Sequence, residues 1–254
     1  MVLLMNKKDL IIKQNRKLSS EIFELCFEGD FQGILPGNFI SLELEGQFLR
    51  RPFSIADFSR DELRIVYRLV GKGTEILSEL KAGDTVNALY PLGNSFTLCG
   101  RHDQPLLIAG GLGLTPLFLL LKELVKKGAV PQIAIGLRSS EDAFYIDRIK
   151  NELDIDPIIF TEDGSLGRAG LVTEALAELE FGRIYSCGPE PMLKQIKMLS
   201  GVPTEFSLEA RMGCAVGACM CCTVKTVSGP KKVCKDGPVF SAEELAFPLS
   251  GGVS

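Results

Sequence analysis

Four cysteines fall within nine residues of this chain, in the stretch RMGCAVGACMCC from Arg211 to Cys222. A further cysteine follows in KKVCKDGP. The spacing C-x4-C-x2-C-x11-C is produced by Cys214, Cys219, Cys222 and Cys234. From about Glu205 onward the chain is short, rich in glycine and cysteine, and too small for an ordinary hydrophobic core. A bound metal centre would supply the missing organisation.

The chemistry of these cysteines depends on the compartment. The N-terminal stretch MVLLMNKKDLII lacks the charged region, long apolar run and cleavage site of a secretory signal. We therefore expect a reducing, cytoplasmic location, where structural disulfides are rare and clustered cysteines bind metal or perform redox chemistry.

The gaps between the cysteines distinguish two kinds of metal site. Zinc sites usually pair their ligands as two separate C-x2-C knuckles, whereas a four-residue gap followed by a two-residue gap matches the plant-type [2Fe–2S] run. Small residues at Gly213, Ala215, Gly217 and Ala218 would let backbone N–H groups approach the sulfurs. The spacing predicts a [2Fe–2S] cluster, with zinc as the alternative. It leaves Cys221 as a surplus thiol that could substitute for Cys222.

Charge and hydropathy argue against two classes of partner. The formal net charge is −4 and there is no basic block, which gives no electrostatic case for nucleic acid or an anionic membrane surface. Residues 104–121 carry no charge and are about as long as a membrane-spanning helix. The glycines and proline of AGGLGLTP would break such a helix, so we predict a strand, a turn and a helix there, with no membrane association.

Three modules follow from the periodicity. Residues 1–100 contain short strand-like runs (IFELCFEG, NFISLELEG, RPFSIAD and ELRIVYRLV) separated by turn residues, which predicts a small antiparallel β-barrel with a short helix after Gly73. Residues 101–204 alternate strands such as PLLIAG and QIAIGLR with amphipathic helices, which predicts an α/β domain with a parallel sheet. Residues 205–254 form the cysteine-rich module.

Two stretches of the α/β region are candidates for nucleotide binding. LLIAGGLGLTPLFLL places Gly110, Gly111 and Gly113 between a strand and a helix, where glycine permits unusual dihedral angles and close approach by a phosphate. Thr115 is expected to cap that helix. The spacing differs from G-x-G-x-x-G, and a glycine turn also serves tight packing. SCGPEPM lies at the end of a later strand, where its Cys187 would face the same crevice at the carboxyl ends of the strands. The alternative is a core position, which a lone cysteine takes more often.

The barrel carries its own motifs. RRPFS begins at Arg50 in a strand-like stretch, and YRLVGKGT places Tyr67 and Arg68 before a helix that opens at Gly73 and Thr74. Arginines, an aromatic ring and a helix N-terminus suit a flat ring system bearing a pyrophosphate. Together with the glycine turn and the cluster spacing they indicate a flavin, which joins two-electron nicotinamide chemistry to a one-electron cluster.

The whole chain resembles the electron-transfer subunits of class B (NAD-dependent) dihydroorotate dehydrogenases, within the ferredoxin–NADP reductase superfamily. The resemblance rests on RRPFSIAD, YRLVGKGT, PLGNSF, GGLGLTPL, DGSLG, SCGPEPML, EARMGCAVGACMCC and VCKDGPVF. It departs in CMCC, where the residue before the third ligand is often another small residue in that family.

The resemblance implies cofactor sites. An FAD site in the barrel would be formed by Arg51, Pro52, Phe53, Ser54, Val66, Tyr67, Arg68, Gly73 and Thr74. NAD would be received by Gly110, Gly111, Gly113, Cys187, Gly188 and Pro189. The [2Fe–2S] ligands would be Cys214, Cys219, Cys222 and Cys234. A separate FMN-containing subunit would oxidise dihydroorotate in pyrimidine biosynthesis, in an assembly of two of each subunit. Its electrons would pass through the cluster and FAD to NAD+.

No general acid or base stands out, and the single histidine, His102, lies in a predicted loop. The choice between NAD and NADP stays open, because Arg138 lies close to Glu141 and Asp142. One alternative is a related reductase subunit that delivers electrons from NAD(P)H to ferredoxin, hydrogenase or sulfur compounds. A zinc-stabilised binding module is the non-enzymatic alternative.

Overall fold

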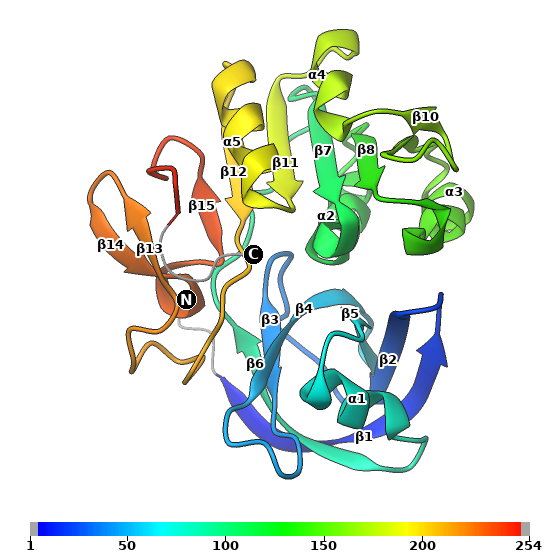
Figure 1. Cartoon of the computed structure of the whole chain (residues 1–254), viewed down its shortest axis with the longest axis vertical. Coiled ribbons are helices and arrows are strands. Elements are labelled where there is room, and N and C mark those ends of the chain that lie inside the picture. Colours follow the sequence, from blue (N-terminus) through cyan, green and yellow to red (C-terminus); the bar gives the residue numbers. More distant parts are fainter. Residues whose placement is uncertain (1–4, 250–254) are drawn as a thin grey trace.

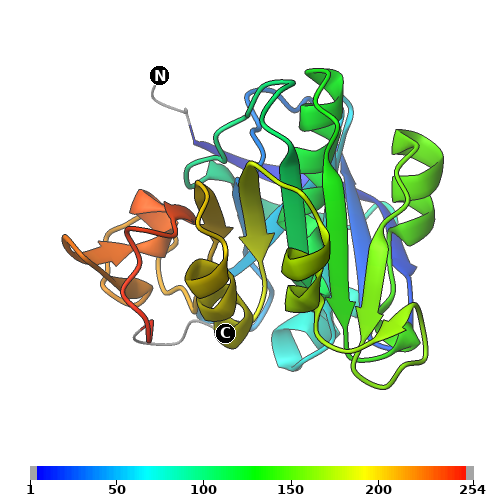
Figure 2. The ribbon, with the colours of Figure 1, turned by 90° about the horizontal axis from the view of Figure 1, so that it is seen from above.

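The computed structural model describes residues 5–249, so the ends of the first and third predicted modules (residues 1–4 and 250–254) lie outside the described residues. Figure 1 shows a barrel below, an α/β layer structure above it, and the C-terminal segments on one side of both. Figure 2, seen from above, shows the parallel sheet with helices on its faces and the tail against one edge.

Six antiparallel strands close into the barrel in the order β1-β2-β5-β4-β3-β6. Their bounds are β1 Asn6–Lys17, β2 Ile22–Glu28, β3 Phe39–Leu42, β4 Arg51–Phe58, β5 Glu62–Arg68 and β6 Thr85–Leu92. Helix α1, Lys72–Glu79, lies between β5 and β6. Alternate positions such as Leu25, Phe27 and Ile65 fill the interior, which is what the period of two requires. The expected antiparallel barrel is confirmed.

Strands β1 and β6 were not among the runs recognised from the sequence. Only Leu10 and Ile12 of β1 are fully buried, and most of its other residues are charged or polar and exposed. Such a strand has little apolar alternation, and its place in the barrel is decided by pairing with β2 and β6.

The second layer is a seven-stranded sheet in the order β10-β9-β8-β7-β11-β12-β15, parallel except at β15. Its strands are β7 Pro105–Gly110, β8 Gln132–Leu137, β9 Ile158–Thr161, β10 Arg168–Ala169, β11 Arg183–Cys187, β12 Thr204–Ser207 and β15 Val239–Ser241. The helices are α2 Leu114–Lys126, α3 Ile146–Leu153, α4 Ala175–Glu178 and α5 Glu190–Leu199, with single 3-10 turns η1 Gly111–Gly113, η2 Ser140–Asp142 and η3 Val172–Glu174. The predicted α/β domain is confirmed.

The C-terminal segment is less separate than the sequence indicates. Strand β12 spans the expected boundary at 204/205 and pairs in parallel with β11, while β15 from the tail adds an antiparallel edge strand. Between them lie the hairpin β13 Thr223–Thr226 and β14 Gly229–Lys232, and the short helix α6 Val233–Asp236. The tail is thereby tied to the nucleotide-type sheet.

Residues 104–121 form β7, the η1 turn and part of α2, as the glycines and proline predict. Among the helices of residues 5–249, none is long and apolar enough to cross a membrane.

Candidate functional site

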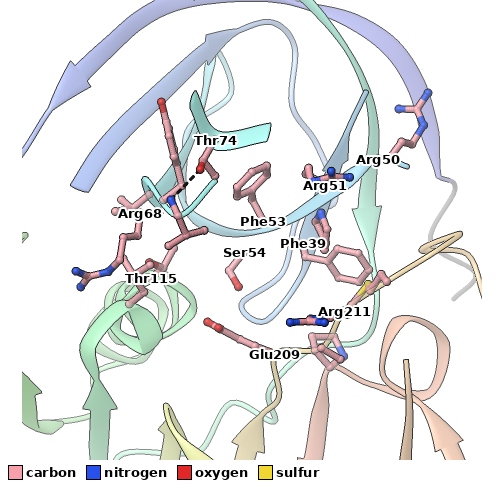
Figure 3. Close-up of a pocket in the computed structure, with 18 of the residues that line it drawn as sticks. Phe39, Arg50, Arg51, Phe53, Ser54, Arg68, Thr74, Thr115, Glu209 and Arg211 are labelled. Carbon is pink, nitrogen blue, oxygen red and sulfur yellow. Dashed lines mark hydrogen bonds between the residues drawn. The ribbon is translucent and has the colours of Figure 1, made fainter. Parts of the chain in front are cut away.

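A cavity of about 740 Å³ opens between the barrel and the C-terminal segment (Figure 3). Strand β4 lines one wall, and the start of α2 and residues 208–212 line the others. Eight of the nine residues expected to form the flavin site line it, namely Arg51, Pro52, Phe53, Ser54, Val66, Tyr67, Arg68 and Thr74. The structure therefore brings two separate barrel motifs to one place.

The ninth expected residue, Gly73, lies behind Arg51 instead of lining the cavity. A Cβ atom on Gly73 would come within 3.0 Å of Arg51 Nε. The Arg51 guanidinium is also held by Gln47 Oε1 at 2.8 Å and by the carbonyl of Leu49 at 2.6 Å. Gly73 thus leaves room for a cation in the cavity wall.

Thr74 shapes the backbone before α1. Its hydroxyl accepts hydrogen bonds from the N–H groups of Val70 at 2.9 Å and Gly71 at 3.2 Å, and donates to the Gly71 carbonyl at 2.8 Å. The dashed line in Figure 3 marks such a bond beside the cavity. This turn holds the helix N-terminus, with its positive dipole end, next to Arg51.

Aromatic side chains give the cavity a flat apolar wall. The rings of Phe53 and Tyr67 meet edge to face with centroids 5.9 Å apart, and Tyr67 stacks on Phe23 at 5.5 Å. Burial raises the pKa of Tyr67, and its hydroxyl donates to Asn15 Oδ1 at 3.2 Å. Tyr67 is therefore a neutral, fixed element of the wall.

The structure changes the role expected of Thr115. Helix α2 begins at Leu114 with Gly113 in the cap position, and no side-chain cap bond is present. The Thr115 hydroxyl is buried, lines the cavity, and has no hydrogen-bond partner among the described residues. A buried hydroxyl left unpaired is costly. The heteroatom edge of a flavin would satisfy it, so the residues present fit that group.

Some lining residues were missed from the sequence. Phe39 of β3 and the segment from Leu208 to Met212 line the cavity, with Glu209 and Arg211 facing the β4 side in Figure 3. Arg211 opens the cysteine stretch and was not among the residues expected at this cavity. Phe39 begins an ordinary strand and residues 208–210 directly follow β12, so no local motif marks these positions.

A second cavity of about 770 Å³ lies at the carboxyl ends of the parallel strands, where open α/β sheets bind ligands. The expected residues Gly110, Gly111, Gly113, Gly188 and Pro189 line it. Gly111 has a φ of +55°, and a Cβ there would meet nothing within 4 Å. The left-handed backbone favours glycine here, and the space beside it is open to a ligand.

Gly113 serves packing instead. A Cβ there would lie 2.0 Å from the backbone carbonyl oxygen of Cys187, so α2 and the end of β11 touch through this glycine. The Cys187 side chain does not face the crevice as expected. It is fully buried in the apolar core, lines neither cavity, and burial raises the pKa of its thiol well above the usual value. The next two residues, Gly188 and Pro189, line the cavity instead.

The two cavities share a wall made of Arg68, Val70, Leu112 and Glu209. Arg68 reaches across from the barrel to Asp142 at 2.7 Å. Arg138 and Glu162 both line the second cavity, so both signs of charge are present near the strand ends. Ligands in the two cavities would therefore lie on either side of these four residues.

The four motif cysteines form two pairs. A backbone hydrogen bond links the two members of each pair: Cys219 N–H donates to Cys214 Sγ, and Cys234 N–H donates to Cys222 Sγ. No three His, Cys, Asp or Glu side chains of residues 5–249 converge as they would around a single metal ion. Two pairs of thiols fit a two-iron cluster, because each iron takes two protein ligands.

Backbone N–H groups point at these sulfurs. Cys219 donates to Cys214 Sγ at 3.3 Å, Gly217 to Cys234 Sγ at 3.2 Å, and Cys234 to Cys222 Sγ at 3.4 Å. Desolvation opposes ionisation of Cys214, but amide donors outweigh it and lower its pKa to about 6. Burial and the neighbouring Cys222 raise the pKa of Cys234 to about 12, so metal binding there would release a proton.

Cys221 lies outside these pairs. Its side chain is exposed and its thiol donates to the Arg211 carbonyl at 3.4 Å, whereas Cys222 is only 1% exposed. The geometry supports Cys222 as the third ligand. His102 is exposed in a turn and lines neither cavity.

The barrel, the two adjoining cavities and the cysteine module define a flavin- and pyridine-nucleotide-dependent reductase with an appended iron–sulfur domain. Residues 209–246 match the iron–sulfur cluster binding domain of dihydroorotate dehydrogenase B. The chain is 37% identical to the electron transfer subunit of dihydroorotate dehydrogenase B (NAD(+)) from Caldanaerobacter subterraneus subsp. tengcongensis, covering 93% of this chain and 97% of the relative. The chain belongs to this family of electron transfer subunits.

Other comparisons agree. The Bacillus velezensis subunit is 39% identical over 96% of this chain and all of its own length. A solved NADH-dependent reduced ferredoxin-NADP oxidoreductase is 28% identical with a TM-score of 0.85, covering 94% of this chain and 90% of that chain. Phthalate dioxygenase reductase, at 20% identity and a TM-score of 0.65 over 79% of this chain and 67% of its own, shares the fold.

Proposed function

We propose that this chain carries electrons from an FMN-containing catalytic subunit, through a [2Fe–2S] cluster and FAD, to NAD+ during dihydroorotate oxidation in pyrimidine biosynthesis. One observation carries the proposal: the three sites are contiguous. The two cavities share a wall, and Met212 lines the first cavity two residues before Cys214. Two residues span at most about 7 Å of extended chain.

The expected residues are proposed for these roles. A flavin exchanges two electrons with nicotinamide and single electrons with an iron–sulfur cluster. Arg51 and Thr74 would hold its polar end, Phe53 and Tyr67 its ring, and Ser54 and Thr115 its heteroatom edge. The second cavity would hold NAD against the shared wall, with Gly111, Gly188 and Pro189 bordering it. Cys214, Cys219, Cys222 and Cys234 would ligate the cluster.

We also propose three functional modules, residues 1–100, 101–204 and 205–254, despite the shared sheet. The name of the relatives, an electron transfer subunit, supports a catalytic partner. An assembly of two of each subunit is our proposal for its stoichiometry. A cytoplasmic location is proposed because thiolate-rich redox chemistry suits a reducing compartment.

The test is spectroscopic and catalytic. The purified chain should show flavin bands on broad iron–sulfur absorption, and should reduce NAD+ with dihydroorotate only together with an FMN protein. A colourless, zinc-containing protein would contradict the proposal. Since one structural neighbour is a reduced ferredoxin-NADP oxidoreductase, the second candidate is a reductase subunit for another acceptor. Co-purification with a ferredoxin or hydrogenase, without dihydroorotate activity, would establish that candidate instead.

Replacing Arg51 by methionine should weaken FAD retention by about tenfold. The substitution removes one charge-assisted hydrogen bond, which contributes about 1.5–3 kcal/mol. Flavin released on dialysis gives the measurement. Arg60→Met is the control, because that side chain is 78% exposed and pairs only at the surface with Asp30. Equal FAD retention in both variants would show that Arg51 does not bind FAD.

A further inference from the structure

A buried group of charges joins the barrel to the α/β domain outside both cavities. We call Glu24, Asp57, Lys122, Tyr145 and Arg148 the interdomain cluster. Glu24 of β2 and Asp57 of β4 belong to the barrel and are only 1% and 5% exposed. The other three belong to the opposite domain, where Lys122 lies on α2, Arg148 lies on α3 and Tyr145 directly precedes α3. Buried carboxylates require such partners, because an unpaired buried charge is strongly destabilising.

Asp57 is held by two cations from the α/β domain. Lys122 Nζ lies 2.5 Å from Asp57 Oδ1, and Arg148 Nη2 lies 2.7 Å from Oδ2. Both oxygens of one carboxylate are therefore bound by groups on two different helices. Charge-assisted bonds of this kind have a defined direction as well as a large energy.

Glu24 contacts α3 and the residue before it through Arg148 and Tyr145. The Tyr145 hydroxyl donates to Glu24 Oε2, and burial followed by the Glu24 charge raises the pKa of Tyr145, so it stays a donor. Arg148 Nη1 is buried without a hydrogen bond among the described residues and lies 3.9 Å from Oε2. Arg16 and Arg64 hold Oε1 from the barrel at 3.1 and 3.2 Å.

The aromatic residues around Arg148 are placed at a conformational cost. Its guanidinium lies 4.6 Å from the ring centroids of both Phe118 and Tyr145. Tyr145 has a φ of +60°, in the left-handed region that a bulky aromatic residue rarely adopts. Such a strained backbone conformation persists only where the surrounding contacts hold it in place, and it is found most often at functional positions.

The elements that carry the interdomain cluster also carry the cavity walls. On β4, Ser54 lines the first cavity and Asp57 follows three residues later, about 10 Å along the strand. On α2, Thr115 lines the same cavity and Lys122 follows seven residues later, about 10 Å along the helix. A shift of α2 against β4 at the cluster would therefore also move Thr115 relative to Ser54 in the cavity wall.

We propose that the interdomain cluster holds the nicotinamide-binding domain in register with the flavin-binding barrel, with Arg148 as the central positioning residue. The inference rests on the proposed function. Outside the cluster, the two domains are joined by the Arg68–Asp142 pair at the shared cavity wall, by an exposed Ser20–Glu141 bond, and by apolar contact, with Ile22, Ala56 and Val66 packing in one core with α2. Apolar contact is non-directional and tolerates sliding. Hydride transfer requires the reacting atoms about 3–3.5 Å apart, so the buried directional bonds of the cluster would fix the alignment that apolar contact leaves free to slide.

Arg148→Met in the full-length, cofactor-containing chain tests the positioning role. At saturating NADH, the limiting rate of flavin reduction in stopped flow should fall about 10- to 100-fold. The long-wavelength charge-transfer absorption between nicotinamide and flavin should weaken, while FAD content stays at the wild-type level. Arg148→Lys should recover part of the rate, because lysine keeps the charge but cannot bind in the same fork geometry.

Arg168→Met is the matched control. Arg168 also pairs with a carboxylate, Glu178, and stacks on a ring, Phe160, but lies wholly within the α/β domain. It should retain the wild-type rate. A limiting rate in Arg148→Met within about twofold of wild type would overturn the positioning role.

A double variant keeps the test possible if Arg148→Met alone does not fold. Asp57→Asn with Arg148→Met removes opposite buried charges together, which proteins often tolerate. It should fold, bind FAD and still reduce its flavin slowly; a folded double variant with the wild-type rate would refute the positioning role. Failure of the proposed function would show differently, as a wild-type chain whose flavin NADH does not reduce at all.

Discussion

Replacing Cys219 by serine abolishes the iron–sulfur cluster, whereas replacing Cys221 by serine leaves it in place. This is the largest difference in iron content that we expect between two substitutions so close in the sequence. Cys219 pairs with Cys214 and its N–H group donates to that sulfur. A serine oxygen is a hard ligand, poorly suited to a thiolate site. Iron content should fall from about two per chain to near zero in the Cys219 variant alone.

Two further measurements sharpen this comparison. The Cys219 variant should lose dihydroorotate-driven reduction of NAD+ in the complex but keep NADH-driven reduction of its own flavin, since the two cavities do not include that residue. The Cys221 variant should keep both, because its exposed thiol is bonded only to the Arg211 carbonyl. Loss of iron from the Cys221 variant would show that the ligand assignment is wrong.

Gly113→Ala should damage both folding and nucleotide binding. The added Cβ would lie 2.0 Å from the Cys187 carbonyl oxygen and 3.0 Å from the Gly188 nitrogen, and neither backbone atom can rotate away. Separating α2 from β11 should cost about 3 kcal/mol or more, as overpacking at a rigid contact does. Thermal unfolding should then occur roughly 6–12 °C lower in a chain of this size.

The control for this variant is Gly71→Ala, which adds the same methyl group where no atom lies within 4 Å and the backbone is extended. It should unfold at the wild-type temperature. Because Gly113 lines the second cavity, Gly113→Ala should also bind NADH at least about tenfold more weakly. Wild-type stability in Gly113→Ala would mean that α2 and β11 are not in the close contact described.

Local chemistry explains what could be predicted from the sequence. The cysteine spacing, the glycine turn and the RRPFS stretch each place their reactive groups within a few residues, so one pattern reveals one site. Strand β1 was missed because most of its residues are polar and exposed, and β6 joins the barrel by pairing with the distant strands β1 and β3. Thr115 was expected to cap α2, but Gly113 takes that position and the hydroxyl turns to the cavity.

The barrel, the α/β domain and the family could be predicted from the sequence, because periodicity and spacing are properties of short segments; the ligand set of the cluster is a prediction of the same kind. The folded molecule was needed to show that the two cavities share Arg68 and Glu209, that the Cys187 thiol is buried, and that Glu24 and Asp57 bind Arg148 across the domains. Each of these depends on elements far apart in the chain. Their approach is set by packing of the whole molecule, which no local pattern encodes.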